Sequence, residues 1–337
     1  MVLAEHAEKA KIELSILGPN ANESEFISLE KCSDDSFHVG RNGVRCILTT
    51  RDRKVEFVFL ESGVLAYIKS SLGYPAYYAV QPTRIQKPVD AVLMDLDGTT
   101  VRSEDFWVWI IERSVASATD NAKFRLEESD IPYVSGHSVS EHLEYCIRKY
   151  CPGKTLELVR EYYFEHSRRE LNEIMQGRGR IDAFSPTTGL KDFLLGIKGK
   201  GIKIGLVTSG LYEKAWPAII SVFRHLNIDD PQIFYDAIIT AGFPLRKGDV
   251  GTLGELSPKP HPWLYSECSR VGMGIAVEKR FHVVGIEDSG AGICSLKLAG
   301  FAPIGIAGGN IVESGTKGLC EHYCENFERI YDIISSH

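Results

Sequence analysis

The chain has 337 residues, 44% of them hydrophobic and 25% charged, with a net charge of -7 and a sequence pI near 5.9. This composition is typical of a globular protein of about two domains, and its acidic balance gives no reason to expect a nucleic-acid or membrane partner. No apolar run approaches the roughly 20 residues that span a bilayer. Eight cysteines without regular spacing, and an N-terminus without the order of a signal peptide, predict a cytoplasmic location.

The first 88 residues predict a small all-β domain. Segments with partial alternation of apolar and polar residues are separated by turn signals; they are KIELSIL, EFISLEK, VRCILTT, KVEFVFL and VLAYIKS. The Asn-Gly pair in RNGV, Arg41 to Val44, predicts a hairpin, so we expect an antiparallel sandwich or barrel. Residues 1–90 hold 11 Lys/Arg against 12 Asp/Glu, which disfavours an oligonucleotide-binding barrel.

From Val89 onward strands and helices alternate, after a proline-containing linker, QPTRIQKPVD. Apolar runs that end in small or polar residues predict the strands; they are AVLMDLD, IKIGLVTSG, DAIITAG, HVVGIED and APIGIAGG. This order predicts a Rossmann-like α/β fold, a parallel sheet with helices on both faces. We therefore expect a β-rich domain at residues 1–88, an α/β core at 89–102 and 184–337, and a helical cap inserted at 103–183.

The segment AVLMDLDGTT delivers two aspartates from a buried strand into a glycine turn. Residues i and i+2 of a strand point to the same face, so Asp95 and Asp97 share one. Two carboxylates on one face repel each other unless a cation or a shared proton lies nearby. The pattern therefore indicates a metal site.

Further polar groups follow the later strands, where the carboxyl ends of a parallel sheet gather at one edge. They are Thr208, Ser209 and Gly210 in GLVTSG, Lys259 between two prolines in LSPKPHP, and Glu287 and Asp288 in VVGIEDSGAG. Hydroxyls and backbone amides bind oxyanions, a lysine meets phosphate charge, and carboxylates hold Mg²⁺. Each residue alone has an ordinary interpretation as a turn, a helix cap or a surface charge; together they predict a site for Mg²⁺ and phosphate.

The motifs DLDGTT, LVTSG, SPKP and GIEDSGAG resemble, in the right order, the four motifs of the haloacid dehalogenase (HAD) superfamily. The resemblance covers residues 89–337. The long helical interval after the first motif resembles the C1 cap of the beta-phosphoglucomutase and phosphoglycolate phosphatase branch. This resemblance implies a Mg²⁺-dependent phosphohydrolase that removes phosphate from a small phosphorylated metabolite through an aspartyl-phosphate.

The resemblance also implies roles for the acidic residues. Asp95 is similar to the nucleophile of the family, and Asp97 resembles its general acid and base. The Mg²⁺ ion would bind Asp95, the backbone carbonyl of Asp97 and Asp288, with Glu287 as a further ligand or just behind the ligands. Retention of Asp97 favours phosphoester chemistry over dehalogenation, because an alkoxide leaving group needs a proton.

The remaining motif residues would bind the phosphoryl group. Thr208 and the amides near Ser209 and Gly210 would hydrogen-bond it, and Lys259 would neutralise its charge. In the cap, the segment YVSGHSVSEHLEY resembles a substrate-specificity loop, and its His137 is a candidate substrate contact or else a solvent-facing histidine. Four cap arginines could bind a second anion, but pairing with Glu170 and Glu173 is favoured; they are Arg168, Arg169, Arg178 and Arg180.

Two other functions remain open. A phosphomutase of the beta-phosphoglucomutase type has the same four motifs. A binding module on a HAD scaffold without catalysis is disfavoured, because a scaffold has no need of Lys259 beside four acids. The β-rich domain would mediate a homo-oligomer or shape access to the cap, and the tyrosines of GYPAYYAV, Gly73 to Val80, suit either an interface or its own core.

Overall fold

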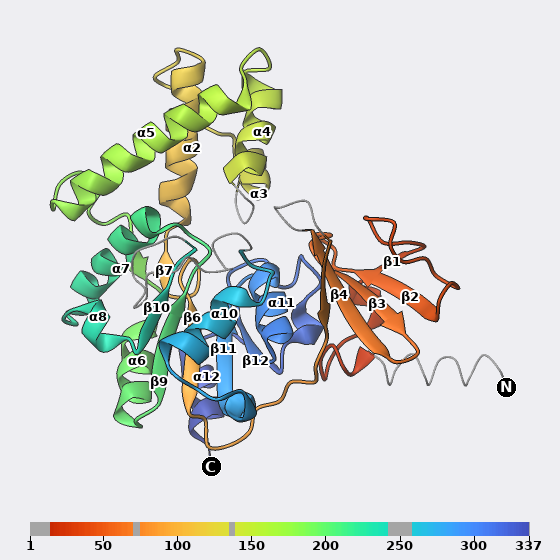
Figure 1. Cartoon of the computed structure of the whole chain (residues 1–337). Coiled ribbons are helices and arrows are strands. Elements are labelled where there is room, and N and C mark those ends of the chain that lie inside the picture. Colours follow the sequence, from red (N-terminus) through yellow and green to blue (C-terminus); the bar gives the residue numbers. More distant parts are fainter. Residues whose placement is uncertain (1–13, 70–74, 135–138, 242–257, 337) are drawn as a thin grey trace. The chain divides into compact units, whose positions relative to one another are not determined.

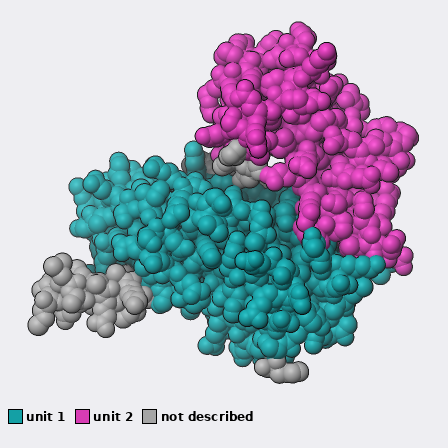
Figure 2. Space-filling model, turned by 180° about the vertical axis from the view of Figure 1, so that it is seen from behind, with its two compact units in different colours: residues 1–99, 188–212, 232–337 teal, residues 100–187, 213–231 magenta. Residues whose placement is uncertain are grey.

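The computed structural model describes residues 14–69, 75–134, 139–241 and 258–336 (Figure 1). Figure 2 shows its two compact units, the first made of residues 1–99, 188–212 and 232–337 and the second of 100–187 and 213–231. Among the described helices, none has the length and apolar character needed to cross a membrane.

A six-stranded parallel sheet forms the centre of the first unit (Figure 1). Its strands, in spatial order, are β10 (Ala237–Ile239), β9 (Lys203–Val207), β6 (Ala91–Asp95), β11 (Val283–Glu287), β12 (Ala302–Ile306) and β13 (His322–Cys324). Each neighbouring pair is parallel. Strand β6 lies between β9 and β11 and is buried along its whole length, which is why its sequence is a continuous apolar run up to Asp95.

Helices accompany this sheet, as the alternation of the sequence predicts, and the Rossmann-like fold is confirmed. Those of the first unit are α6 (Leu190–Gly199), α10 (Trp263–Glu267), α11 (Gly290–Ala299) and α12 (Phe327–Ser335). Helices α6 and α12 meet through Phe193 and Phe327, whose ring centroids are 4.8 Å apart. Helices α10 and α11 pack against the sheet residues Leu93 and Val207 through Leu264 and Leu296.

The N-terminal domain is a single five-stranded antiparallel sheet with strands in chain order. The strands are β1 (Ile27–Leu29), β2 (Val44–Thr49), β3 (Glu56–Leu60), β4 (Gly63–Lys69) and β5 (Pro75–Ala79). The all-β domain is confirmed, but two details differ from the expectation. In KIELSIL the described residues form a turn, closed by the Leu17 amide on the Leu14 carbonyl at 2.9 Å. The fifth strand is instead β5, in the tyrosine-rich segment.

The expected sandwich or barrel is wrong for the described residues, because the parallel-sheet domain supplies the second layer. On one face of the N-terminal sheet, Phe57 and Phe59 belong to a buried cluster that also contains Ile293 and Leu298 of α11 and Leu319. The alternate residues of β3 face a separate small cluster with β2. A second β-layer is therefore not needed to bury the sheet.

The second unit is mainly helical. Its main helices are α2 (Glu104–Ala118), α3 (Ile131–Val134), α4 (Val139–Tyr150), α5 (Leu156–Met175) and α7 (Tyr212–Leu226). The short helix α8 (Pro231–Phe234) follows α7. Two short antiparallel strands, β7 (Val101–Arg102) and β8 (Ser185–Pro186), pair where the insertion begins and ends.

Two of the four arginines among residues 168–180 have the glutamate partners expected from the sequence. Arg169 lies 3.1 Å from a carboxylate oxygen of Glu170, and Arg178 lies 2.7 Å from one of Glu173. Arg180 instead lies over the ring of Trp109, with its guanidinium carbon 4.6 Å from the ring centroid. Ion pairs of this kind explain the first two charges without a ligand.

Replacement of Phe57 by alanine tests the shared cluster. Phe57 is fully buried and stacks edge-on with Phe26 at 6.0 Å, so Phe57→Ala is expected to lower the free energy of unfolding by about 3–5 kcal/mol. Urea unfolding followed by circular dichroism measures the change. Val39→Ala, at a side chain that is 41% exposed, is the control and should stay within about 0.5 kcal/mol. Equal stability of Phe57→Ala and wild type would contradict the place of Phe57 in the shared cluster.

Candidate active site

The candidate site lies at the carboxyl ends of the three central strands. Strand β6 ends at Asp95 and β11 ends at Glu287, which Asp288 follows, while Thr208 follows β9. These strands are parallel neighbours, so their carboxyl ends meet at one edge of the sheet. All four side chains are buried, with at most 8% of any residue exposed. Burial of so many polar groups demands partners for each of them.

Lys259 is the cation that these carboxylates share. Its Nζ donates to Asp95 Oδ1 at 2.5 Å and to Glu287 Oε1 at 2.7 Å, and only 6% of its side chain is exposed. A longer bond, 3.3 Å, reaches the carbonyl of Val207. The backbone amide of Lys259 donates to Ser209 Oγ at 3.1 Å. The interpretation of Lys259 as a surface loop charge is therefore wrong.

The pKa values at this edge reflect too many carboxylates for one lysine. Burial, and then the charge of Glu287, raise the pKa of Asp95 to about 8 against the opposing effect of Lys259. Burial, together with the charges of Asp95 and Glu287, raises the pKa of Asp288 well above its usual value. Burial alone would lower the pKa of Lys259, but its two carboxylate partners outweigh it and raise that pKa.

Both carboxylate oxygens of Glu287 are occupied by protein donors. Oε1 accepts from Lys259 and also from the hydroxyl of Tyr265 at 2.5 Å. Oε2 accepts from the amide of Ser289 at 3.3 Å and from its hydroxyl at 3.0 Å. An oxygen with two donors has little capacity left for a cation. Glu287 is therefore better placed to hold Lys259 in position than to bind a cation.

Asp288 occupies a space that two glycines leave open. A Cβ atom at Gly98 would lie 2.0 Å from Asp288 Oδ2, and one at Gly309 would lie 2.4 Å from the same oxygen. Gly98 also has φ of +82°, in the left-handed region that favours glycine. The glycine after the two motif aspartates is thus required both by the turn and by the approach of Asp288.

The acidic residues fit a divalent cation. One carboxylate oxygen from each of Asp95, Glu287 and Asp288 lies within 4.8 Å of the others. Three buried carboxylates against a single lysine leave an excess of negative charge, and carboxylate oxygens are the ligands that Mg²⁺ prefers. Because the oxygens of Glu287 are taken, Asp95 and Asp288 are the members of the set best placed to bind the ion directly.

The structure places the other predicted residues as follows. Thr208 Oγ1 accepts from the Gly210 amide at 2.9 Å, so this amide is engaged within the loop, and Ser209 holds the Lys259 backbone. Asp97 is exposed, and its charge contributes to the raised pKa of Asp95. His137 lies outside the described residues.

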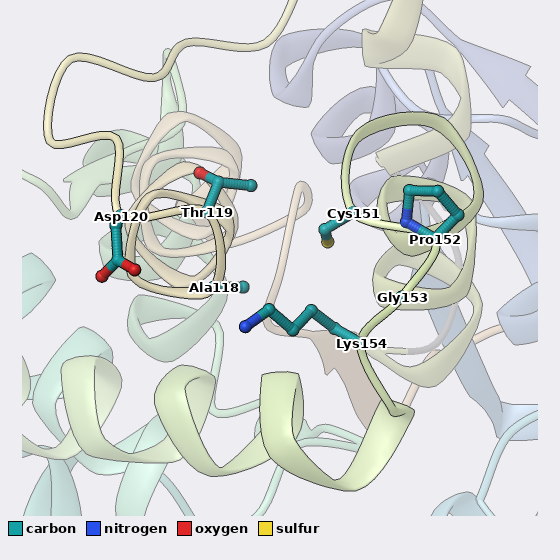
Figure 3. A pocket seen from close by; sticks show the side chains of 7 residues that line it. All are labelled: Ala118, Thr119, Asp120, Cys151, Pro152, Gly153 and Lys154. Carbon is teal, nitrogen blue, oxygen red and sulfur yellow. The ribbon is translucent and has the colours of Figure 1, made fainter.

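A separate pocket in the second unit has different chemistry. It has a volume of about 400 Å³ and lies between the end of α2, at Ala118 to Asp120, and the loop from Cys151 to Lys154 (Figure 3). Its thiol, Cys151, has its pKa raised by burial, which keeps it protonated and a poor nucleophile. The carboxylate-rich edge of the parallel sheet is therefore the stronger candidate.

Comparison with known proteins identifies the family of the chain. A family model described as a haloacid dehalogenase-like hydrolase matches residues 89–300, which is more than half of the chain. The chain belongs to the haloacid dehalogenase-like hydrolases. The resemblance seen in the four sequence motifs is thus confirmed, and residues 1–88 lie outside the match. No curated protein matches the chain.

Solved structures of HAD-like proteins are similar over most of their length. CbbY from Rhodobacter sphaeroides in complex with phosphate is 16% identical, with 72% of this chain and 96% of that chain covered and a TM-score of 0.51. A predicted phosphoglycolate phosphatase from Haemophilus somnus 129PT is 17% identical, with 74% and 99% covered and a TM-score of 0.51. A HAD-superfamily hydrolase, subfamily IA, variant 1, from Geobacter sulfurreducens PCA is 16% identical, with 75% and 100% covered and a TM-score of 0.51. At these identities the likeness shows the fold.

Sequence reasoning missed Tyr265. This residue of α10 is fully buried, its ring centroid lies 4.7 Å from Lys259 Nζ, and its hydroxyl reaches Glu287. Burial, and then the charge of Glu287, raise the pKa of Tyr265 well above its usual value, so the hydroxyl stays a donor. A tyrosine within the apolar segment that follows the motif lysine was the available signal, because a buried hydroxyl needs a partner.

Replacement of Gly292 tests how tightly Glu287 is held. A Cβ at this position of α11 would lie 1.8 Å from the Glu287 carboxylate carbon, and Glu287 cannot move without losing its bonds to Lys259, Tyr265 and Ser289. Gly292→Ala is expected to lower the free energy of unfolding by about 2–4 kcal/mol in urea denaturation. The control is Gly199→Ala in α6, where a Cβ has no neighbour within 4 Å and stability should stay or rise by up to about 1 kcal/mol. Equal stability of Gly292→Ala and wild type would show that Glu287 is not fixed.

Proposed function

We propose that this HAD-like hydrolase is a Mg²⁺-dependent phosphohydrolase that removes phosphate from a small phosphorylated metabolite through an aspartyl-phosphate at Asp95. The observation that carries the proposal is the buried bond of 2.5 Å between Lys259 Nζ and Asp95 Oδ1. A carboxylate that must approach an anionic ester needs positive charge beside it, and Lys259 supplies that charge from within the protein.

In the first half-reaction, a carboxylate oxygen of Asp95 attacks phosphorus and the bond from phosphorus to the leaving oxygen breaks. Asp97 donates its proton to that oxygen, which departs as an alcohol. In the second half-reaction, Asp97 takes a proton from water, whose oxygen attacks phosphorus. The bond to Asp95 then breaks, which releases phosphate and restores the carboxylate.

The other residues hold the charges in place. Lys259 offsets the negative charge between Asp95 and the phosphoryl oxygens, and Glu287 and Tyr265 hold Lys259 in position. The Thr208 hydroxyl hydrogen-bonds the phosphoryl group. The residues that would hold Mg²⁺ are Asp95 and Asp288, with the backbone carbonyl of Asp97 and with Glu287 just behind them. When bound, the ion supplies positive charge that stabilises the phosphoryl oxygens in the transition state.

We propose residues 103–183 as the cap that selects the substrate, with His137 as a contact to the leaving group. Two of the three named neighbours, a phosphate complex of CbbY and a predicted phosphoglycolate phosphatase, support a small phosphorylated molecule as the class to test. Eight free cysteines accord with a cytoplasmic enzyme.

Phosphate release from a panel of sugar phosphates, phosphoglycolate and nucleotides tests the proposal. Release is expected to require Mg²⁺, to stop with a chelator, and to fall about 10³-fold or more in Asp95→Asn, because the amide cannot form the aspartyl-phosphate. Asp229→Asn, at an exposed residue, is the matched control and should keep full activity. Conversion of a sugar phosphate into its isomer without phosphate release would identify a phosphomutase, and activity of Asp95→Asn equal to wild type would refute the proposed nucleophile.

The cation has a readout that needs no substrate. The pKa of Asp95 is raised to about 8 in the folded state, so the folded protein binds more protons than the unfolded one between about pH 4 and 8. In a chelator, the stability of wild type relative to Asp95→Asn should therefore fall as pH rises from 5 to 8, and added Mg²⁺ should restore it at pH 8. Urea denaturation at the two pH values measures this. If the stability difference between wild type and Asp95→Asn were the same at both pH values, with and without Mg²⁺, this result would contradict a cation at Asp95.

A further inference from the structure

We propose that the N-terminal sheet is part of the active-site machinery, because its Tyr78 acts through His261 to position the loop that carries Lys259. The activity readout of this inference rests on the phosphohydrolase function proposed above. Tyr78 and His261 are positioning residues in this proposal, since neither touches Lys259 Nζ or the carboxylates. In this proposal, the N-terminal sheet helps to hold Lys259 in its position at the site.

The imidazole of His261 is bonded to two strands of the N-terminal sheet. Its Nδ1 lies 2.7 Å from the hydroxyl of Tyr78, in β5. The ring also makes a hydrogen bond to the backbone of Lys69, the last residue of β4. His261 is only 3% exposed, so these contacts are made away from water, where a lost hydrogen bond leaves a polar group unsatisfied.

The protonation state of His261 suits these partners. Burial lowers the pKa of His261, and the bond to the Lys69 backbone only partly opposes that, so the ring is neutral near pH 7. A neutral imidazole has one donor and one acceptor nitrogen. With the Tyr78 hydroxyl donating to Nδ1, the ring N–H donates to the Lys69 carbonyl. The hydrogen-bonding capacity of the His261 ring is then used entirely by the N-terminal sheet.

The main chain around His261 links these contacts to Lys259. His261 follows Lys259 by two residues, and its amide donates to the carbonyl of Pro258 at 3.0 Å across the loop. The carbonyl of His261 accepts from Ser295 Oγ of α11 at 2.6 Å. One side of the short loop is thus fixed by the parallel-sheet domain and the other by the N-terminal sheet.

The ring of Tyr78 adds a second connection. It lies edge-on to His261 at 5.8 Å and edge-on to Trp263 at 5.9 Å between centroids. Trp263 begins helix α10, which also carries Tyr265 to Glu287. The two ring partners of Tyr78 are therefore close in sequence to functional residues. His261 is near Lys259, and Trp263 is near Tyr265, which donates to Glu287.

A small shift of Lys259 is expected to lower the reaction rate. Its Nζ lies 2.5 and 2.7 Å from two carboxylates, and a displacement of about 1 Å at a catalytic group can cost on the order of 10²-fold in rate. The family match begins at residue 89, so Lys69 and Tyr78 both lie outside the part of the chain that is shared with the family.

Tyr78→Phe removes the hydroxyl and keeps the ring. We expect kcat to fall about 10-fold with KM nearly unchanged, because the loop relaxes while the rest of the site stays in place. Tyr77→Phe is the matched control: its hydroxyl donates to Asp34, in the turn between β1 and β2, at 2.9 Å, and its kcat should stay within about twofold of wild type. His261→Asn, whose amide can replace Nδ1 as acceptor, should keep more activity than His261→Ala, and Tyr78→Phe should add no further loss to His261→Ala.

Hydrogen exchange of the backbone amides of Lys259 and His261 gives a second readout that needs no substrate. Faster exchange at these amides in Tyr78→Phe than in Tyr77→Phe would support the inference even if no phosphatase activity were found, in which case only the proposed function would fail. Unchanged exchange and unchanged kcat in Tyr78→Phe would overturn it. Equal changes in both tyrosine variants would also overturn it, because they would indicate general loosening of the sheet.

Discussion

The site is organised around one buried cation. Lys259 is surrounded by the carboxylates of Asp95 and Glu287, and an ion pair removed from water is stable only if its geometry and its remaining hydrogen bonds are nearly complete. The structure meets that demand with Tyr265 and Ser289 on Glu287 and with Ser209 on the lysine backbone. Most of the polar contacts at this edge of the sheet can be understood as the environment that one buried ammonium group requires.

The same edge contains more negative charge than Lys259 can neutralise. The raised pKa values of Asp95 and Asp288 express that excess, and a cation bound between them would lower both. Under the proposed function, the same cation would also stabilise the charge on a phosphoryl group.

Much of the core could be predicted from sequence because its motifs follow strands, and the ends of parallel strands have only one place to meet. The positions of Asp95, Thr208, Glu287 and Asp288 follow from that rule. Contacts that depend on the tertiary structure could not be predicted from the sequence. Strand β5 was missed because its tyrosines alternate weakly, and the open N-terminal sheet was missed because its covering layer lies more than 200 residues further along the chain.

Tyr265 and His261 illustrate the same limit at the level of single side chains. Both are polar residues in buried positions, and sequence indicates that each needs a partner but not which one. The partner of His261 is on a strand that precedes the family fold, so no motif of the family could identify it.

Helix α11 has one further consequence, for synthesis of the protein. It is buried nearly throughout, with Leu296 toward the parallel sheet and Ile293 and Leu298 toward the N-terminal sheet. On a ribosome the N-terminal sheet emerges first, and its apolar face with Phe57 lacks the part of its cover that α11 supplies until this helix has been made. At about 5–20 residues per second, that interval is on the order of 10–40 s, long enough for chaperones to bind the nascent chain.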